Sequence, residues 1–186
     1  MISIQLETSR LILRPPIESD LDGWAAFDGD ARATAFFGGP KSRAASWENL
    51  ATVAGMWALR GGGLLSVIEK GSGRWIGRIG PWKPEGATAE IGWAMLPSVW
   101  RQGYAAEGAA AAIDWAIDHL VWTQINHCID AGNAPSIALA EKLGARWLRS
   151  DHDAHGKEVQ VYGQTSQQWR SCRARSRRSP SRTRHG

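Results

Sequence analysis

The hydrophobic pattern of this chain changes abruptly at Gly61-Gly62-Gly63, and this change constrains the fold more than any other feature. Before it, large apolar residues recur every three or four positions over 44–59, which is the spacing of one helix face. After it, short apolar segments at 64–68, 74–79 and 88–96 are separated by residues typical of turns. The sequence therefore predicts a helix followed by an antiparallel meander of strands.

An alanine-rich segment after this meander predicts a long helix over 104–120. Near the start of the chain, Ser19 or Asp20 is placed to cap a helix that follows a short strand. The remaining predicted elements are strands at 10–14, 124–129, 145–150 and 158–162 and a helix at 134–143. This order indicates an α/β fold of the α+β type, with a mixed, mostly antiparallel sheet of about six to seven strands and helices on both faces.

Charge is distributed unevenly along the 186 residues. The net charge is +4, but seven of the 22 basic residues lie after Trp169, where there is no acidic residue. The rest of the chain holds 15 basic and 18 acidic residues, a net charge of −3. Arginine and serine without an apolar pattern are typical of disorder. We therefore expect a folded domain at 1–163 and a basic, disordered tail at 164–186.

Several classes of protein do not fit this composition. Cys128 and Cys172 are too few for a disulfide framework, and no Cys/His spacing matches a zinc site, so no metal is expected. No apolar segment is long enough to cross a bilayer, and the first residues lack the layout of a signal peptide. A cytoplasmic globular protein without membrane contact is the expectation.

The segment Trp100-Arg-Gln-Gly-Tyr-Ala105 connects the last strand of the meander to the alanine-rich helix. A glycine turn at a helix N-terminus directs unpaired backbone N–H groups and the positive end of the helix dipole at one point, which favours a phosphate. An ordinary strand-to-helix turn is the alternative, because the spacing matches neither common nucleotide motif.

A second polar group follows the predicted strand at 124–129. Asn133 stands at the end of this segment, and Ser136 lies in the first turn of the next helix, with Pro135 at a position that suits a helix start. Polar residues at such strand ends often bind ligands, but helix capping explains the same residues equally well.

Together these motifs resemble one family. The segments Ala89-Glu-Ile-Gly-Trp93, Trp100-Arg-Gln-Gly-Tyr-Ala-Ala-Glu107, Asn133-x-x-Ser136 and Glu141-Lys-Leu-Gly144 are similar in order and spacing to the GCN5-related N-acetyltransferases (GNAT superfamily). The opening Leu6-Glu-Thr-Ser-Arg-Leu-Ile-Leu-Arg14 resembles the RimJ/RimL-like branch, the ribosomal-protein N-acetyltransferases. The resemblance covers about 6–162 and implies the GNAT fold.

The resemblance implies acetyl-CoA as co-substrate. The backbone of the phosphate turn would hold the pyrophosphate, the end of the preceding strand would pair with the pantetheine, Asn133 would bond the pantetheine, and Ser136 would lie near the sulfur. The implied cofactor-binding residues are Trp93, Met95, Leu96, Arg101, Gln102, Gly103, Tyr104, Ala105, Ala106, Asn133 and Ser136.

Direct acetyl transfer to an amine needs a base for the amine proton and a hydrogen-bond donor for the departing thiolate. Glu90 is the candidate base because it lies on the strand beside the implied cofactor groove, although an ion pair or a solvated carboxylate is the alternative. Ser136 is the implied donor. Acceptor contacts are expected from Phe37, from Trp82 in the loop between two strands, from Glu90, and from His155 in the late acidic loop.

The expected function is an acetyl-CoA-dependent N-acetyltransferase acting on a primary amine, either a protein N-terminus or a small molecule. One alternative is a ribosome- or nucleic-acid-binding protein that uses the arginine-rich tail. Another is a family member that binds CoA without catalysis. Homodimerisation is common in the branch and remains open.

Overall fold

The computed structural model describes residues 4–83, 85–86, 88–153 and 156–178. In this part of the chain eight strands form two sheets, and every pairing between strands is antiparallel. The strands are β1 (Leu6–Glu7), β2 (Leu11–Arg14), β3 (Leu65–Glu69), β4 (Trp75–Trp82), β5 (Glu90–Met95), β6 (Gln124–Ile129), β7 (Arg146–His152) and β8 (Glu158–Thr165). The helices are α1 (Leu21–Asp28), α2 (Arg43–Arg60), α3 (Tyr104–His119), α4 (Ala134–Lys142) and α5 (Ser166–Arg178).

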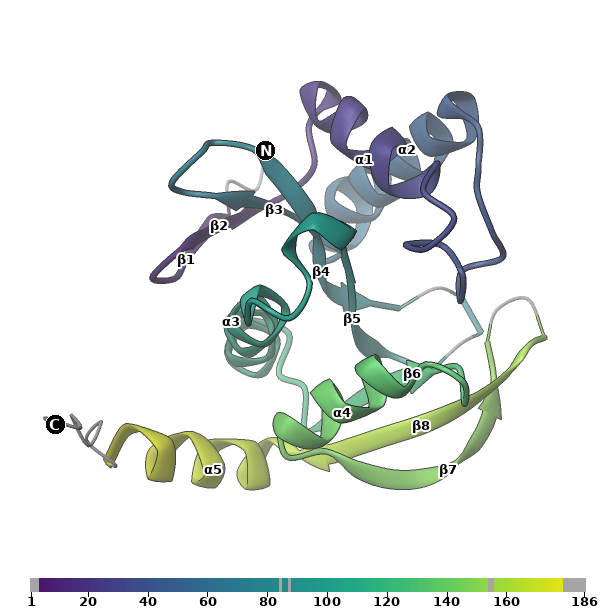
Figure 1. Ribbon diagram of the computed structural model, residues 1–186. Helices are drawn as coiled ribbons and strands as arrows, with labels where there is room; N and C mark the ends of the chain where they lie inside the picture. Colours follow the sequence, from purple (N-terminus) through teal and green to yellow (C-terminus); the bar gives the residue numbers. More distant parts are fainter. Residues whose placement is uncertain (1–3, 84, 87, 154–155, 179–186) are drawn as a thin grey trace, which may run out of the picture.

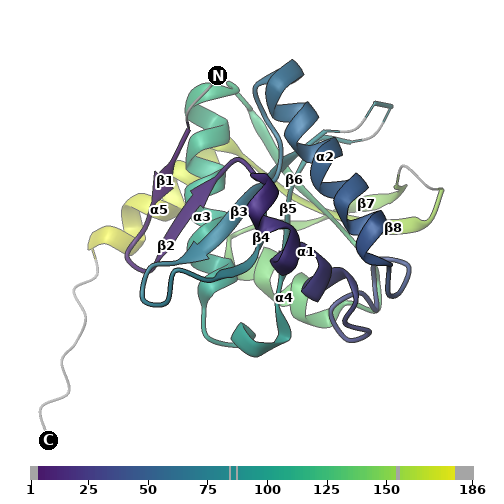
Figure 2. The same ribbon diagram turned by 90° about the horizontal axis from the view of Figure 1, so that it is seen from above.

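The predicted α/β class with antiparallel strands and helices on both faces is confirmed, but the strands divide into two sheets. The first five pair in chain order, β1-β2-β3-β4-β5, and the last three pair in the order β6-β8-β7. Helices α1 and α2 cover one face of the five-stranded sheet and α3 covers the other (Figures 1 and 2). The two sheets meet along β5 and β6, which no backbone ladder joins.

The main core lies between α3 and the five-stranded sheet. Small residues on the inner face of α3 permit the close packing expected from its sequence, since Ala109, Ala112 and Ala116 are fully buried. Gly108 shows how close this contact is, because a Cβ atom there would lie 2.7 Å from Ile79. The helix bounds predicted for α2 and α3 agree with the structure to within a residue, because both helices carry a clear apolar stripe.

The predicted capping of α1 is wrong. Asp20 precedes the helix, but its side chain makes no capping bond. Its carboxylate instead accepts two hydrogen bonds from Arg14, at 2.7 and 2.8 Å, and one from the Ser66 hydroxyl at 2.8 Å. Asp20 is therefore a buried ion-pair partner that ties the start of α1 to strands β2 and β3.

The expectation of a disordered tail is wrong for residues 164–178. Strand β8 continues to Thr165, and α5 follows it directly. Trp169 is only 2% exposed, and its indole N–H donates to Asp114 on α3 at 2.7 Å. Arg170 and Arg173 pair with Asp118 and Asp114. One buried tryptophan and two ion pairs hold this helix against α3. Because it lacks a repeating apolar pattern, its sequence did not predict a helix. Residues 179–186 lie outside the described part.

Candidate active site

Side chains, not backbone pairs, connect β5 to β6 where the two sheets meet. The carboxylate of Glu90 accepts from the backbone N–H of Cys128 at 2.7 Å, and the Asn126 amide donates to the Ala89 carbonyl at 3.2 Å. The His127 ring lies 2.9 Å from the Ile91 carbonyl through Nδ1. Because a carbonyl can only accept, Nδ1 carries the proton. Beyond these contacts the strands run in different directions (Figure 1), which leaves an edge of β5 without a neighbouring strand.

The free edge of β5 is centred on Trp93. The Ile91 carbonyl accepts from His127, and the Met95 carbonyl accepts from the Trp100 indole at 2.8 Å, so both point away from β4. The Leu96 N–H, by contrast, donates to Ile76 on β4 at 2.9 Å. Since alternate residues of a strand direct their backbone groups to the same side, the N–H and C=O of Trp93 face the gap between the sheets. Trp93 is thus the backbone position with which an extended ligand would pair.

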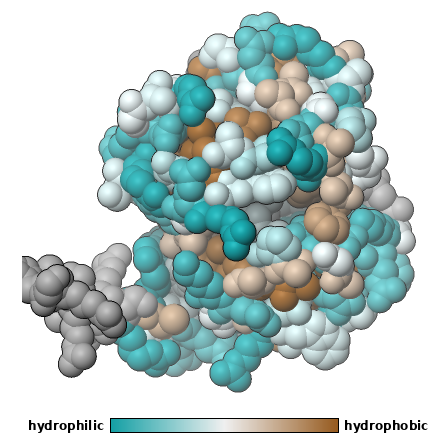
Figure 3. Space-filling view, in the orientation of Figure 1, coloured by the Kyte–Doolittle hydropathy of each residue, from teal (hydrophilic) through white to brown (hydrophobic). Residues whose placement is uncertain are grey.

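The Trp93 side chain crosses the gap to α4. Its indole N–H donates to the Ser136 hydroxyl at 3.2 Å, and its ring lies 4.7 Å from that of His127. Because the indole uses one of the hydroxyl lone pairs, the Ser136 proton stays available for another acceptor. In Figure 3, hydrophobic residues gather in the hollow between the parts of the molecule formed by the two sheets.

Asn133 caps α4, as the alternative interpretation of this residue predicted. Its side-chain oxygen accepts from the backbone N–H of Ser136 at 3.2 Å. The cap uses only the oxygen, so the side-chain NH₂ can still donate to a ligand. Pro135 lies in the first turn of the helix, as predicted.

The turn before α3 has the geometry that suits an anion. Arg101 and Gly103 both adopt left-handed conformations, with φ values of 61° and 83°. Gly103 is the N-cap of α3, where no side chain makes a capping bond. Glu107 N–H donates to the Gly103 carbonyl, but the backbone N–H groups of 101–106 have no acceptor among the described residues. Several amides and the helix dipole therefore converge at this turn.

Arg10 supports this turn, a role that no sequence motif indicated. Its guanidinium donates to the Gln102 carbonyl at 3.0 Å and to Glu107 at 2.7 Å, and it lies 4.2 Å from the ring centre of Tyr104. The Tyr104 hydroxyl donates to Glu69 at 2.5 Å. The Tyr104 side chain is therefore directed into the protein, and only its backbone belongs to the turn. Arg10 and Glu107 lie 97 positions apart in the sequence, so only the fold reveals the contact.

The electrostatic environment of Glu90 suits a base. Burial raises the pKa of this carboxyl to about 7, against the opposing effect of the hydrogen bond from Cys128, and Asp153 raises it further. Burial likewise raises the pKa of the Cys128 thiol to about 12, so this cysteine stays protonated at neutral pH and is a poor nucleophile. The pKa of His127 falls to about 4 because burial disfavours the imidazolium, so His127 is neutral.

The predicted acceptor residues are only partly brought together. Trp82 is the last residue of β4 and not a loop residue, and it pairs directly with Glu90 across the sheet. Cross-strand partners share a face, so Trp82 and Glu90 lie together. Phe37 is 44% exposed and packs edge-on against Phe27, with no contact to Glu90 among the described interactions. His155 lies outside the described residues.

Glu90 and Trp93 lie on opposite faces of β5, because consecutive strand residues alternate. Ala94, which shares a face with Glu90, packs against Phe27 of α1, whereas Met95, which shares a face with Trp93, joins the core beneath α3. A carboxylate on one face and a hydroxyl donor on the other therefore flank the free edge at Trp93. This arrangement is typical of transferases, because a donor and an acceptor bound on opposite faces of β5 would meet at its free edge.

The comparisons with known proteins give this class a family. The family model described as "Acetyltransferase (GNAT) domain" matches residues 10–146, about three quarters of the chain. The chain therefore belongs to the GNAT acetyltransferase family, whose members transfer acyl groups. No curated protein matches the sequence significantly.

Solved structures agree with this assignment. An acetyltransferase from Agrobacterium tumefaciens is 28% identical, with a TM-score of 0.77 over 87% of this chain and 94% of that one. A GNAT-family acetyltransferase from Bacillus anthracis is 22% identical, with a TM-score of 0.76 over 88% and 99%. A ribosomal-protein-S5-alanine acetyltransferase from Vibrio fischeri is 13% identical, with a TM-score of 0.70 over 89% and 98%. The last two likenesses concern the fold alone.

The described part of the chain has neither a metal-binding cluster nor a membrane-spanning helix. Within the described residues, no group of three or more His, Cys, Asp or Glu side chains is arranged to hold a metal ion. None of the helices in that part of the chain is long and apolar enough to cross a membrane.

Proposed function

We propose that this protein is an acetyl-CoA-dependent N-acetyltransferase that moves an acetyl group directly to a primary amine. The observation that carries the proposal is the position of Glu90 and Ser136 on the two sides of the free β5 edge, beside an N-terminal turn of α3 with unused amides. Family membership supports acyl transfer, and these residues supply the chemistry for a nitrogen acceptor.

The residues at the gap fit the donor. The amides of 101–106 would hold the pyrophosphate, the backbone of Trp93 would pair with the pantetheine, and the Asn133 NH₂ would donate to it. Met95 is a weaker contact than predicted from the resemblance, because its carbonyl already accepts from Trp100. When bound, acetyl-CoA supplies the activated acetyl thioester.

Each catalytic side chain has one task. Glu90 accepts the proton that the amine loses as its bond to the acetyl carbon forms, and with a pKa of about 7 it can both take and release that proton near neutral pH. Ser136 donates a hydrogen bond to the sulfur as the carbon–sulfur bond breaks, and the Trp93 indole holds its oxygen in place. Cys128 takes no part, because direct transfer requires proximity and no acyl-enzyme.

The acceptor would approach from the face that carries Glu90 and Trp82. Asp151 lies on this side, where it accepts from the Thr88 hydroxyl at 3.1 Å, and Asp153 is close enough to raise the pKa of Glu90. Asp151 is paired with Arg149 at 2.9 Å, so it is the Glu90 carboxylate that favours a cationic amine over a neutral or acidic acceptor. The N-terminal sequence resemblance and the likeness of fold to a ribosomal-protein acetyltransferase support a protein N-terminus of the RimJ/RimL type as acceptor.

The decisive variant is Glu90→Gln, because glutamine keeps the shape and the hydrogen bond from Cys128 but cannot take a proton. We expect kcat to fall about a hundredfold. In the wild type, kcat/KM should rise with pH up to about 7, as Glu90 loses its proton, and this dependence should vanish in the variant. Thiol release from acetyl-CoA, followed over a panel of N-terminal peptides and small amines, measures both.

Glu48→Gln on the exposed face of α2 is the matched control and should leave the pH profile unchanged. If Glu90→Gln and Ser136→Ala both turn over as the wild type does, the assigned roles are wrong. If no amine is acetylated although CoA binds, the chain is a CoA-binding member of the family without catalysis.

A further inference from the structure

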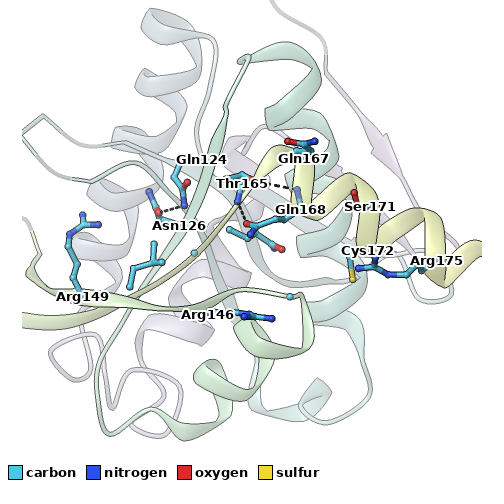
Figure 4. A pocket seen from close by; sticks show the side chains of 14 residues that line it. Gln124, Asn126, Arg146, Arg149, Thr165, Gln167, Gln168, Ser171, Cys172 and Arg175 are labelled. Carbon is cyan, nitrogen blue, oxygen red and sulfur yellow. Dashed lines mark hydrogen bonds between the residues drawn. The ribbon is translucent and has the colours of Figure 1, made fainter.

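An open groove of about 1020 Å³ lies where β6, β7 and the end of β8 meet α5 (Figure 4). Gln124 and Asn126 of β6 line it. The residues between and after them, Ile125, His127 and Ile129, are buried on the other face of the same strand, where Ile129 packs against Ala140 of α4. Since strand residues alternate, the groove is on the face of the three-stranded sheet opposite to α4 and Ser136.

The lining of this groove is cationic. It includes Arg146, Arg149 and Arg175, and none of the described residues that line it is acidic. Arg146 and Arg175 are exposed and have no hydrogen-bond or ion-pair partner among the described residues. Arg149 shares its charge with Asp151 at 2.9 Å.

The arginines of α5 are divided between two faces of the helix. Arg170 and Arg173 are neutralised by Asp118 and Asp114 of α3, whereas Arg175 faces the groove. The sequence has no acidic residue after Glu158, and Arg182 and Arg184 follow α5. The charges of Arg146 and Arg175 thus face the groove without an acidic partner among the described residues, so an anionic occupant is favoured.

The uncharged residues of the lining favour a nucleic acid over an acidic peptide as the anion. Five carry amides: Gln124, Asn126, Gln164, Gln167 and Gln168. The NH₂ groups of Asn126 and Gln164 donate to the Ala89 and Leu143 carbonyls and Gln164 is buried, so the amides exposed to a ligand are those of Gln124, Gln167 and Gln168. Such groups match the edges of nucleotide bases and the ribose 2′-hydroxyl, and guanidinium planes stack on unpaired bases. Leu148 is the one large apolar side chain in the lining, which offers little to an acidic peptide. A second copy of the chain would place the same arginines opposite one another, which like-charge repulsion disfavours.

We propose that this groove binds single-stranded RNA, with Arg146, Arg149 and Arg175 contacting phosphates and the amides contacting bases and 2′-hydroxyl groups. The groove and Ser136 lie on opposite faces of the three-stranded sheet, so changes at Arg146 and Arg175 leave the acetyl-donor side unaltered, whereas Arg149 and Asn126 reach Thr88 and Ala89 near Glu90.

Fluorescence anisotropy of the full chain with a labelled, mixed-sequence RNA of about 12 nucleotides tests this proposal. The double variant R146Q/R175Q should bind at least about tenfold more weakly, and its plot of log affinity against log KCl concentration should be shallower by about 2. Both residues are exposed, so the fold should be retained, and acetyl transfer measured on the same preparation should equal that of the wild type.

The double variant R32Q/R43Q makes the same change in net charge on α2 and the segment before it, far from the groove, and should bind RNA within about twofold of wild type. Equal affinity of the two double variants would overturn the proposal. Equally tight binding of DNA of the same sequence would also overturn it, as would displacement of the RNA by polyglutamate at equal charge. A dimer of the chain that buries the groove would overturn it as well. Loss of binding on removal of 179–186 with R146Q/R175Q unaffected would assign the RNA to the last residues and also overturn it.

Discussion

The two helices that begin beside the gap, α3 and α4, have N-termini of opposite character. The first turn of α3 has a left-handed glycine as its N-cap and no side-chain cap, so its amides are left for a ligand. The first turn of α4 is closed by Asn133, whose oxygen occupies the Ser136 amide. The same structural element therefore offers uncapped amides that suit an anion in one place and, in the other, a fixed frame that orients one hydroxyl.

Among changes at these two helix N-termini, the largest effect is expected from Gly103→Val, which adds a side chain at the uncapped start of α3. A valine at a φ of 83° is strained, and its Cβ would lie 3.4 Å from the Arg10 guanidinium, at the turn proposed to bind the pyrophosphate. We expect CoA to bind about 30-fold more weakly by calorimetry. Gly73→Val has a similar strain, at a φ of 69°, with nothing within 4 Å, and should leave CoA affinity unchanged. Equal losses in both variants would show that strain alone explains the effect.

A smaller, purely kinetic effect is expected from Ser136→Ala, because the proposed role of the hydroxyl is to donate to the departing sulfur and not to bind the cofactor. We expect kcat to fall about tenfold, with the dissociation constant of CoA within about twofold of wild type. Trp93→Phe, which removes the indole N–H that fixes the serine oxygen, should give a smaller loss in the same direction. A large change in CoA affinity with normal kcat would instead make Ser136 a binding residue.

The smallest effect is expected from Asn133→Ala, which removes the side-chain cap of α4. Loss of the cap should lower the free energy of unfolding by about 1 kcal/mol in urea titrations, and Ser42→Ala, which removes the cap of α2, should do the same. Asn133→Ser keeps a capping oxygen but no NH₂. If this amide binds the cofactor, both Asn133 variants should weaken CoA binding and Ser42→Ala should not.

Local patterns account for the parts of the fold that the sequence predicted. Helices α2 and α3 have a long apolar stripe and were predicted to within a residue. The meander β3 to β5 has turn residues between its strands and was predicted in the right order, with strand ends displaced by up to three residues. The family motifs indicated the turn at Gly103 and the pair Asn133 and Ser136 in the same way.

Contacts between distant segments could not be predicted. The approach of Arg10 to the α3 turn joins residues far apart in the chain, and the role of Trp100 depends on where its indole meets the Met95 carbonyl. The order of α5 rests on the burial of one tryptophan among polar residues. The raised pKa of Glu90 arises from burial between the two sheets, which the strand sequence alone does not show.

The docking of α5 has a consequence for how the protein is made. Trp169 completes the core cluster that also holds Ile113, Ala116 and Ile117 of α3, yet it belongs to α5, which a ribosome synthesises after all the other described helices and strands. Helix α3 therefore emerges with one flank uncovered and Asp114 and Asp118 unpaired, and it gains this cover only once α5 has been synthesised. Premature termination at Gly163 would leave that flank exposed, so α5 is part of the folding unit.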